Sequence, residues 1–135
     1  MPDSQEKLHR AFCMKDTYET GLAGERFAAE WLRQKYGMQL IESRCRNKGG
    51  EIDLIMADGD TIAFIEIKTR LNAPRGSGLM SVDFRKQKRI ARAAVLWLME
   101  HDFMNRSVRF DAAEVSSSGI LYIRNAFQPG NMFYR

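Results

Sequence analysis

The chain has 135 residues, 44% of them apolar, which suits a single compact domain with one hydrophobic core. No apolar run approaches the roughly 20 residues needed to cross a bilayer, and the polar N-terminus lacks the apolar core of a secretory signal, so a cytoplasmic protein is expected. Two cysteines and two histidines argue against a disulfide framework, a structural zinc site or a histidine-rich metal centre, while a net charge of +4 and a pI of about 9.3 permit a polyanionic partner.

The first regular element predicted along the chain is a helix over Thr17–Tyr36, with Gly37 as its C-terminal stop. Residues 1–16 before it show no periodicity and are expected to form a mobile arm, so that a single domain spans residues 17–135. Apolar residues recur at helical spacing along one side of this helix, and Glu25 falls on or beside that side. An acid is therefore predicted next to a packing surface.

Three strands are predicted next, over residues 38–45, 51–57 and 61–69. A basic, glycine-rich turn, residues 46–50, joins the first two, and a turn at residues 58–60 joins the second and third. Because both connections are short, the three strands are expected to pair as an antiparallel meander.

The second half of the chain is expected to add a helix and two strands. After an irregular loop at residues 72–78, a helix is predicted over residues 83–101, followed by strands over residues 107–115 and 120–124. The third strand, the second helix and the fourth strand then form a right-handed crossover with parallel pairing. The expected fold is α/β, a mixed sheet with flanking helices in the order α-β-β-β-α-β.

Two of the predicted strands carry charges in interiors that are otherwise apolar, namely Asp53 in the second and Glu66 and Lys68 in the third. Alternation places Glu66 and Lys68 on one face of the third strand, and it places Ile52, Leu54 and Met56 together on the face of the second strand opposite Asp53. A four-residue turn sets Asp53 directly opposite Glu66, whereas a two-residue turn makes them diagonal neighbours. Either turn brings both carboxylates within reach of one cation.

Two carboxylates this close repel each other unless a cation lies between them or one is protonated. Mg²⁺ or Mn²⁺ suits such a site, because a few carboxylates, several waters and a substrate phosphate complete its coordination. The ammonium of Lys68 is placed to orient water or to stabilise charge that develops on the phosphate. The alternative for the Glu-x-Lys triplet taken alone is a solvated salt-bridging pair.

The charged residues, in this order, resemble the PD-(D/E)xK nuclease superfamily, and most closely the predicted endonucleases of the YraN (UPF0102) family, which are distantly similar to archaeal Holliday junction resolvases. The likeness covers about residues 21–115 and is carried by Gly24-Glu25, Gly50-Glu51-Ile52-Asp53-Leu54-Ile55, Glu66-Ile67-Lys68-Thr69-Arg70, Arg85-Lys86-Gln87-Lys88 and Phe110-Asp111. It implies a restriction-endonuclease-like core. It also implies that Asp53 and Glu66 ligate the metal, that Lys68 is the catalytic lysine, and that Glu25 is an additional metal or water ligand. Ile52 stands where the superfamily usually has proline.

The resemblance implies a metal-dependent endonuclease, in the manner of a resolvase, that acts on DNA and that by analogy forms a homodimer. Phosphate contacts are expected from eight basic residues, most of them close to the charged strands: Arg44, Arg46, Lys48, Arg70, Arg75, Lys86, Lys88 and Arg89. The alternatives are a nucleic-acid-binding module with this fold and no turnover, within a DNA-processing assembly, and a protein-interaction domain that uses its aromatic C-terminal tail. Asp111 and Glu114 are interpreted either as supporting groups of the site or, more simply, as surface or strand-edge charges.

Overall fold

The computed structural model describes residues 17–70 and 83–128. The predicted N-terminal arm, the loop at residues 72–78 and residues 129–135 of the aromatic tail lie outside the described residues, whereas Phe127 of the tail is buried in the core against Phe110. The predicted order of elements is confirmed, and the elements are α2 (Thr17–Tyr36), β1 (Gln39–Asn47), β2 (Gly50–Asp58), β3 (Thr61–Arg70), α3 (Phe84–Glu100), β4 (Ser107–Ser116) and β5 (Gly119–Ile123).

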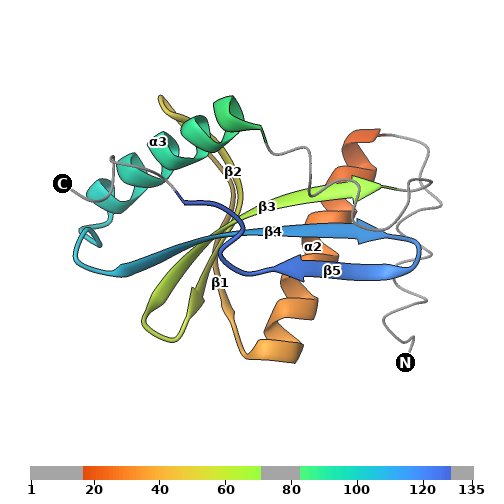
Figure 1. The fold of residues 1–135 in the computed structure, drawn as a ribbon. Coiled ribbons are helices and arrows are strands. Elements are labelled where there is room, and N and C mark those ends of the chain that lie inside the picture. The colour runs from red at the N-terminus through yellow and green to blue at the C-terminus, as the bar shows by residue number, and fades with distance from the viewer. Residues whose placement is uncertain (1–16, 71–82, 129–135) are drawn as a thin grey trace.

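The strands form a five-stranded mixed sheet in the order β1-β2-β3-β4-β5. β1, β2 and β3 pair antiparallel, β3 and β4 pair parallel, and β5 returns antiparallel to β4, so the predicted meander and the parallel crossover are both confirmed. Figure 1 shows α2 and α3 on opposite sides of this sheet. Among the described residues, no helix is long and apolar enough to cross a membrane.

The core consists of two clusters, one on each face of the sheet. Beneath α3, Phe64 packs against Trp97 and Phe110, with ring centroids 5.9 Å and 5.5 Å apart. On the other face, Leu32 of α2 packs in a cluster with Ile65 and other sheet residues. Six consecutive residues of β3, residues 62–67, are buried as a result. A charge on this central strand therefore lies in the protein interior, where it needs partners.

The boundaries of the helices follow their capping residues. Asp83 is the N-cap of α3, and its side chain accepts a hydrogen bond from the backbone N–H of Lys86 at 2.8 Å. α2 ends before Gly37, whose φ of 70° is the left-handed conformation that glycine adopts without strain. These caps explain why α3 begins and α2 ends close to where the sequence predicts.

The turn between β1 and β2 is shorter than predicted, because β1 continues to Asn47 and β2 begins at Gly50. The Asn47 side chain donates to the backbone carbonyl of Ala93 in α3 at 3.0 Å and accepts from the Gly49 backbone N–H at 2.8 Å. A Cβ atom at Gly49 would lie 2.6 Å from the Ala93 nitrogen, so only glycine allows this approach. The turn is thus fixed against α3 by contacts between segments far apart in the sequence.

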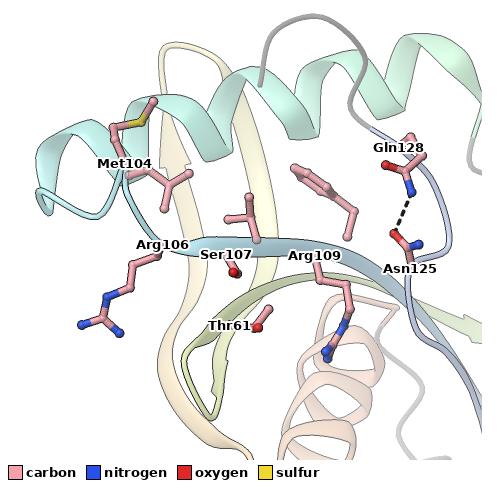
Figure 2. Close-up of a pocket in the computed structure, with 10 residues that line it drawn as sticks. Thr61, Met104, Arg106, Ser107, Arg109, Asn125 and Gln128 are labelled. Carbon is pink, nitrogen blue, oxygen red and sulfur yellow. Dashed lines mark hydrogen bonds between the residues drawn. The ribbon is translucent and has the colours of Figure 1, made fainter. Parts of the chain in front are cut away.

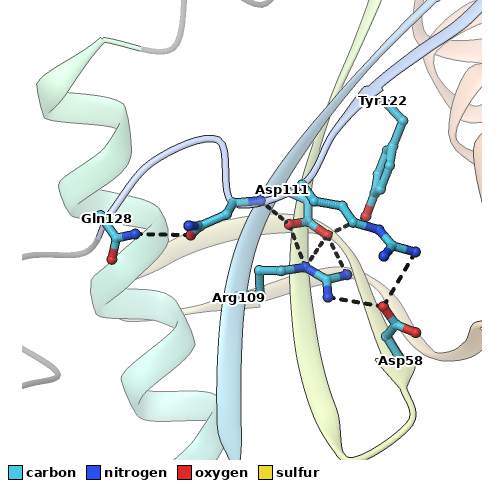
Figure 3. Close-up of polar contacts among 7 residues, drawn as sticks. Asp58, Arg109, Asp111, Tyr122 and Gln128 are labelled. Carbon is cyan, nitrogen blue, oxygen red and sulfur yellow. Dashed lines mark hydrogen bonds and ion pairs between the residues drawn. The ribbon is translucent and has the colours of Figure 1, made fainter.

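The interpretation of Asp111 as a surface or strand-edge charge is wrong, because its exposure is 0%. Its carboxylate accepts hydrogen bonds from the Arg109 guanidinium at 2.9 Å and 3.0 Å, from the Asn125 backbone N–H at 2.8 Å, and from the Tyr122 hydroxyl (Figure 3). Arg109 also forms an ion pair with Asp58 at 3.0 Å. This network joins β4 and β5 to the hairpin end of β2, at the other end of the sheet from Lys68.

We expect Asp111→Asn to lower the free energy of unfolding by about 3 kcal/mol, because it leaves the Arg109 guanidinium without its main buried counter-charge. Urea unfolding measures the change. The matched control is Asp60→Asn, which removes the same charge from an exposed turn position. An equal and small loss in both variants would contradict a structural role for the Asp111 network.

Candidate metal and phosphodiester site

The site begins where β2 separates from β3. The strand partners run as far as Leu54 and Ile65, and this register continued by one residue sets Asp53 opposite Glu66. It is the register predicted for a four-residue turn, although the turn itself has only two residues. Beyond the last pair, the Asp53 carboxylate accepts the backbone N–H of Ile67 at 2.8 Å. The Asp53 side chain thus accepts a β3 backbone N–H in the place where a backbone carbonyl of β2 would accept it in a regular sheet. This bond holds Asp53 beside Glu66.

The regular alternation of β2 is interrupted at the same place. Leu54 and Met56 pack in the cluster beneath α2, but Ile52 packs in the cluster beneath α3. The prediction that these three residues share one face is therefore wrong for Ile52. The physical reason lies in the neighbouring strand, where Arg44 has a φ of 52° and breaks the pleat of β1 alongside Asp53.

Glu66 is 5% exposed and has two lysine partners. Lys68, on the same face of β3, places its Nζ 3.6 Å from Glu66 Oε1, and Lys86 from the first turn of α3 forms a closer ion pair with the same oxygen. Burial and then the Lys86 ammonium lower the pKa of Lys68. Burial opposes the charge of Lys86, but the ion pair with Glu66 outweighs it and raises the pKa of Lys86. From the sequence, Lys86 is predicted only as a phosphate contact, and its ion pair with Glu66 is not predicted.

Glu25 approaches the site from α2 and is 8% exposed. Its carboxylate accepts a hydrogen bond from Arg44 Nε at 2.9 Å. Burial raises the pKa of Glu25, and the bond with Arg44 offsets this only in part. A Cβ atom at Gly24 would collide with the Thr69 hydroxyl, so the glycine lets α2 approach the end of β3 and brings Glu25 with it.

The pKa of Asp53 is raised to about 7. The largest cause is burial, followed by the negative charge of Glu66, while the hydrogen bond from Ile67 acts in the opposite direction and the charge of Glu25 adds to the rise. The negative charges of Glu66 and Glu25 therefore both disfavour the ionised form of Asp53. A cation among them would relieve this repulsion.

The donor set fits a hard cation such as Mg²⁺ or Mn²⁺ in its chemistry, since Asp53 and Glu66 supply oxygen ligands from facing strands. Within residues 17–70 and 83–128, however, no three His, Cys, Asp or Glu side chains lie close enough together to enclose an ion. Protein cations stand beside the carboxylates instead, Arg44 at Glu25 and Lys86 at Glu66. Water and a phosphate would have to complete the coordination sphere, and Lys86 would have to leave Glu66.

Glu114 lies opposite Lys68 in the parallel register of β3 and β4, so both side chains are on the same face of the sheet. It is 1% exposed, and its interpretation as a surface or strand-edge charge is wrong. A buried acid therefore stands in the strand next to the lysine. Its proximity to Lys68 depends on the crossover register, which the local sequence does not specify.

A basic cleft of about 720 Å³ opens next to the acids, between the β1–β2 turn and the start of α3. Lys86 belongs to its lining as well as to the ion pair with Glu66. The cations of the cleft come from β1 and from two turns of α3, and they outnumber the acids Glu51 and Asp83: they are Arg46, Arg85, Lys86 and Arg89. We call this feature the basic cleft.

The eight predicted phosphate contacts are thus distributed over different places. Three of them line the basic cleft, and Arg75 lies outside the described residues. Arg44 is paired with Glu25, and the Lys88 ammonium lies 4.7 Å above the ring of Phe84. The remaining two are at the β1–β2 turn and at the end of β3, namely Lys48 and Arg70.

A second hollow, of about 570 Å³, lies at the start of β3 and β4, at the opposite end of β3 from Lys68 (Figure 2). Its polar lining consists of hydroxyl, amide and guanidinium groups, contributed by Thr61, Arg106, Ser107, Arg109, Asn125 and Gln128. Carboxylates are absent from this described lining, so it offers no acidic ligands for a divalent cation.

The fold and the site together define an α/β protein with an α-β-β-β-α-β core that carries Asp, Glu and Lys beside a basic cleft. The chain belongs to the uncharacterised protein family UPF0102, whose model matches residues 24–115, and this confirms the predicted membership of that family. A UPF0102 protein of Alkalilimnicola ehrlichii is 42% identical over 81% of this chain and 86% of its own. One from Pseudomonas putida is 42% identical over 80% of this chain and 92% of its own.

Among solved structures, one titled "Crystal structure of SSO0001" is similar to this chain with a TM-score of 0.45 and 14% sequence identity. The alignment covers 94% of this chain and 61% of that one.

Proposed function

We propose that the protein is a metal-dependent endonuclease that hydrolyses phosphodiester bonds in DNA. The observation that carries the proposal is the meeting of Asp53, Glu66 and Lys68 where β2 separates from β3, next to the basic cleft. Acids with a raised pKa, here Asp53 and Glu25, together with a lysine of lowered pKa, are typical of reactive sites and are costly to keep for structure alone.

In this proposal Asp53 and Glu66 hold Mg²⁺ or Mn²⁺, and Glu25 is an additional metal or water ligand. The bound ion would polarise a phosphoryl oxygen and lower the pKa of a coordinated water. Lys68 lies two residues beyond Glu66 and orients its ammonium toward the same place. Its part is to stabilise the charge that develops on the phosphate during attack.

The choice of a nucleic acid as substrate rests on the basic cleft. Its cations adjoin Glu66 through Lys86, so a backbone that places one phosphate at the acids places its neighbours against the cleft. The affinity should fall steeply as salt is added, since each phosphate contact releases counterions. A homodimer would allow two such sites to act on both strands or on both arms of a junction.

The proposal is tested by incubating the purified protein with duplex, single-stranded and branched DNA in the presence of Mg²⁺, Mn²⁺ or EDTA. Cleavage that requires the metal and that is lost in Asp53→Ala and Lys68→Ala supports it. Salt-sensitive binding without cleavage under any metal would instead favour the second candidate, a binding module that keeps the fold and acts within a DNA-processing assembly.

A further inference from the structure

Lys86 belongs to two places at once. Its ammonium forms an ion pair with Glu66, and its side chain lines the basic cleft. The backbone beneath it is fixed, because the Lys86 N–H is the donor to the Asp83 cap. The long side chain is therefore anchored at its base while its charged end lies at the border between the acids and the cleft.

Protein cations already occupy the acids that would bind the metal. Arg44 pairs with Glu25, and the ammonium groups of Lys68 and Lys86 both lie against Glu66 Oε1. A divalent cation bound by Glu66 would be repelled by the two ammonium groups at this oxygen. One protein cation must therefore move away, and it needs a new anionic partner when it does.

Lys86 is the cation best placed to move. Its side chain is 38% exposed, compared with 21% for Lys68 and 25% for Arg44. Lys68 extends from the buried central strand, and Arg44 holds a carboxylate that comes from α2. Lys86 alone among the three lines the basic cleft, where Arg46 and Arg89 would gather an anion next to it.

We infer that the basic cleft is a binding subsite for a phosphate of the nucleic-acid backbone and that Lys86 exchanges between this phosphate and Glu66. This inference rests on the proposed function. In the free protein, Lys86 occupies Glu66 and weakens the binding of a divalent cation. When a backbone phosphate enters the cleft, Lys86 pairs with it and releases the carboxylate. The backbone and the metal then promote each other's binding.

The coupling is reciprocal, because a ligand that favours one arrangement of Lys86 must favour the other ligand by the same factor. The site would therefore hold its metal tightly only when a polyanion is in place. A free acidic site would remain largely unloaded at low metal concentration, which protects nucleic acid bound elsewhere from adventitious cleavage.

The first test measures Mn²⁺ binding to the DNA-free protein by the loss of the electron paramagnetic resonance signal of free Mn²⁺. We expect Lys86→Met to bind Mn²⁺ about tenfold more tightly than the unmodified protein. Lys35→Met is the matched control and should change nothing, because Lys35 lies over Trp31 in the last turn of α2 and belongs to neither the acids nor the basic cleft. Lys86→Gln repeats the test with a polar side chain, and circular dichroism confirms folding. Glu66→Gln reports whether the acids bind the ion at all.

The second test measures the affinity for a fluorescent single-stranded oligonucleotide by anisotropy, in a Lys68→Met background that keeps the DNA intact. Added Mn²⁺ should raise this affinity about tenfold, and Lys86→Met should remove most of that gain while Lys35→Met retains it. Inorganic phosphate in place of the oligonucleotide should show a much smaller effect, since it contacts fewer of the cations in the cleft.

The outcomes separate the inference from the proposed function. If Glu66→Gln loses Mn²⁺ binding but Lys86→Met and Lys86→Gln bind it no more tightly than the unmodified protein, the exchange of Lys86 is overturned and the metal site stands. If Glu66→Gln binds Mn²⁺ as well as the unmodified protein does, the metal site itself is overturned, and the inference with it.

Discussion

Replacement of Glu66 by glutamine should reduce metal-dependent DNA cleavage by about a thousandfold or more. Glu66 is the buried acid to which Asp53, Lys68 and Lys86 are all directed, so its loss removes a proposed metal ligand and the partner of both lysines. In EDTA the affinity for DNA should not fall, because the cations of the basic cleft remain and Lys86 is no longer paired with Glu66. A gel assay of cleavage and an anisotropy titration measure the two quantities on the same protein.

The control for this variant is Asp60→Asn, which makes an equal change of charge at the exposed turn between β2 and β3. It should cleave DNA like the unmodified protein. A thermal melt verifies that Glu66→Gln is folded. Full cleavage by folded Glu66→Gln would show that the acids of the β2–β3 site are not the reactive centre.

Replacement of Asp53 by asparagine should make the metal-free protein more stable at neutral and basic pH. The pKa of Asp53 is about 7 in the folded protein against an ordinary value of 3.8, so between these values the folded state binds more protons than the unfolded state. The free energy of unfolding therefore falls as the pH rises from about 4 to about 7. Above pH 7 the free energy of unfolding is at most about 4 kcal/mol lower than at pH 4 because of this group.

Asp53→Asn carries no such charge, and its amide oxygen still accepts the Ile67 N–H. We therefore expect the free energy of unfolding of Asp53→Asn to be about 2 kcal/mol higher than that of the unmodified protein at pH 8. Near pH 4 the two values should be equal. Urea unfolding at a series of pH values, with EDTA present, measures this difference. A variant that is less stable than the unmodified protein at pH 8 would show that the Asp53 charge is well compensated in the fold.

Both expectations have one physical origin, which is that the acids are kept together at a cost to stability. Burial and mutual repulsion raise the pKa of Asp53, while Lys86 and Arg44 supply part of the compensation. Asp111 is different, because Arg109, Tyr122 and the Asn125 backbone satisfy its carboxylate fully. We therefore expect opposite effects on stability when either acid is neutralised.

Much of the fold follows from local sequence. Periodicity and capping residues such as Gly37 and Asp83 mark the helices, and short polar turns mark the meander. The approach of Asp53 to Glu66 was predictable as well, because side-chain alternation and an even turn length bring them together in either register. These features depend on residues close to one another in the chain.

The parts that were not predicted depend on contacts between distant segments. The position of Ile52 follows from a distortion in the neighbouring strand, and the extension of β1 follows from the packing of Asn47 on α3. The Lys86–Glu66 pair requires the start of α3 to lie over β3, and the burial of Asp111 requires β5 to fold back with Tyr122. None of these has a signal in the local pattern, because each is set by tertiary packing.

The central claim is that Asp53 and Glu66 bind a divalent cation, and a crystal structure determined with Mn²⁺ from its anomalous scattering tests it most directly. The claim predicts an anomalous peak about 2.1 Å from carboxylate oxygens of both residues, with Lys86 turned away from Glu66. A map without a peak at these acids, with Lys86 still paired to Glu66 at saturating Mn²⁺, would contradict it.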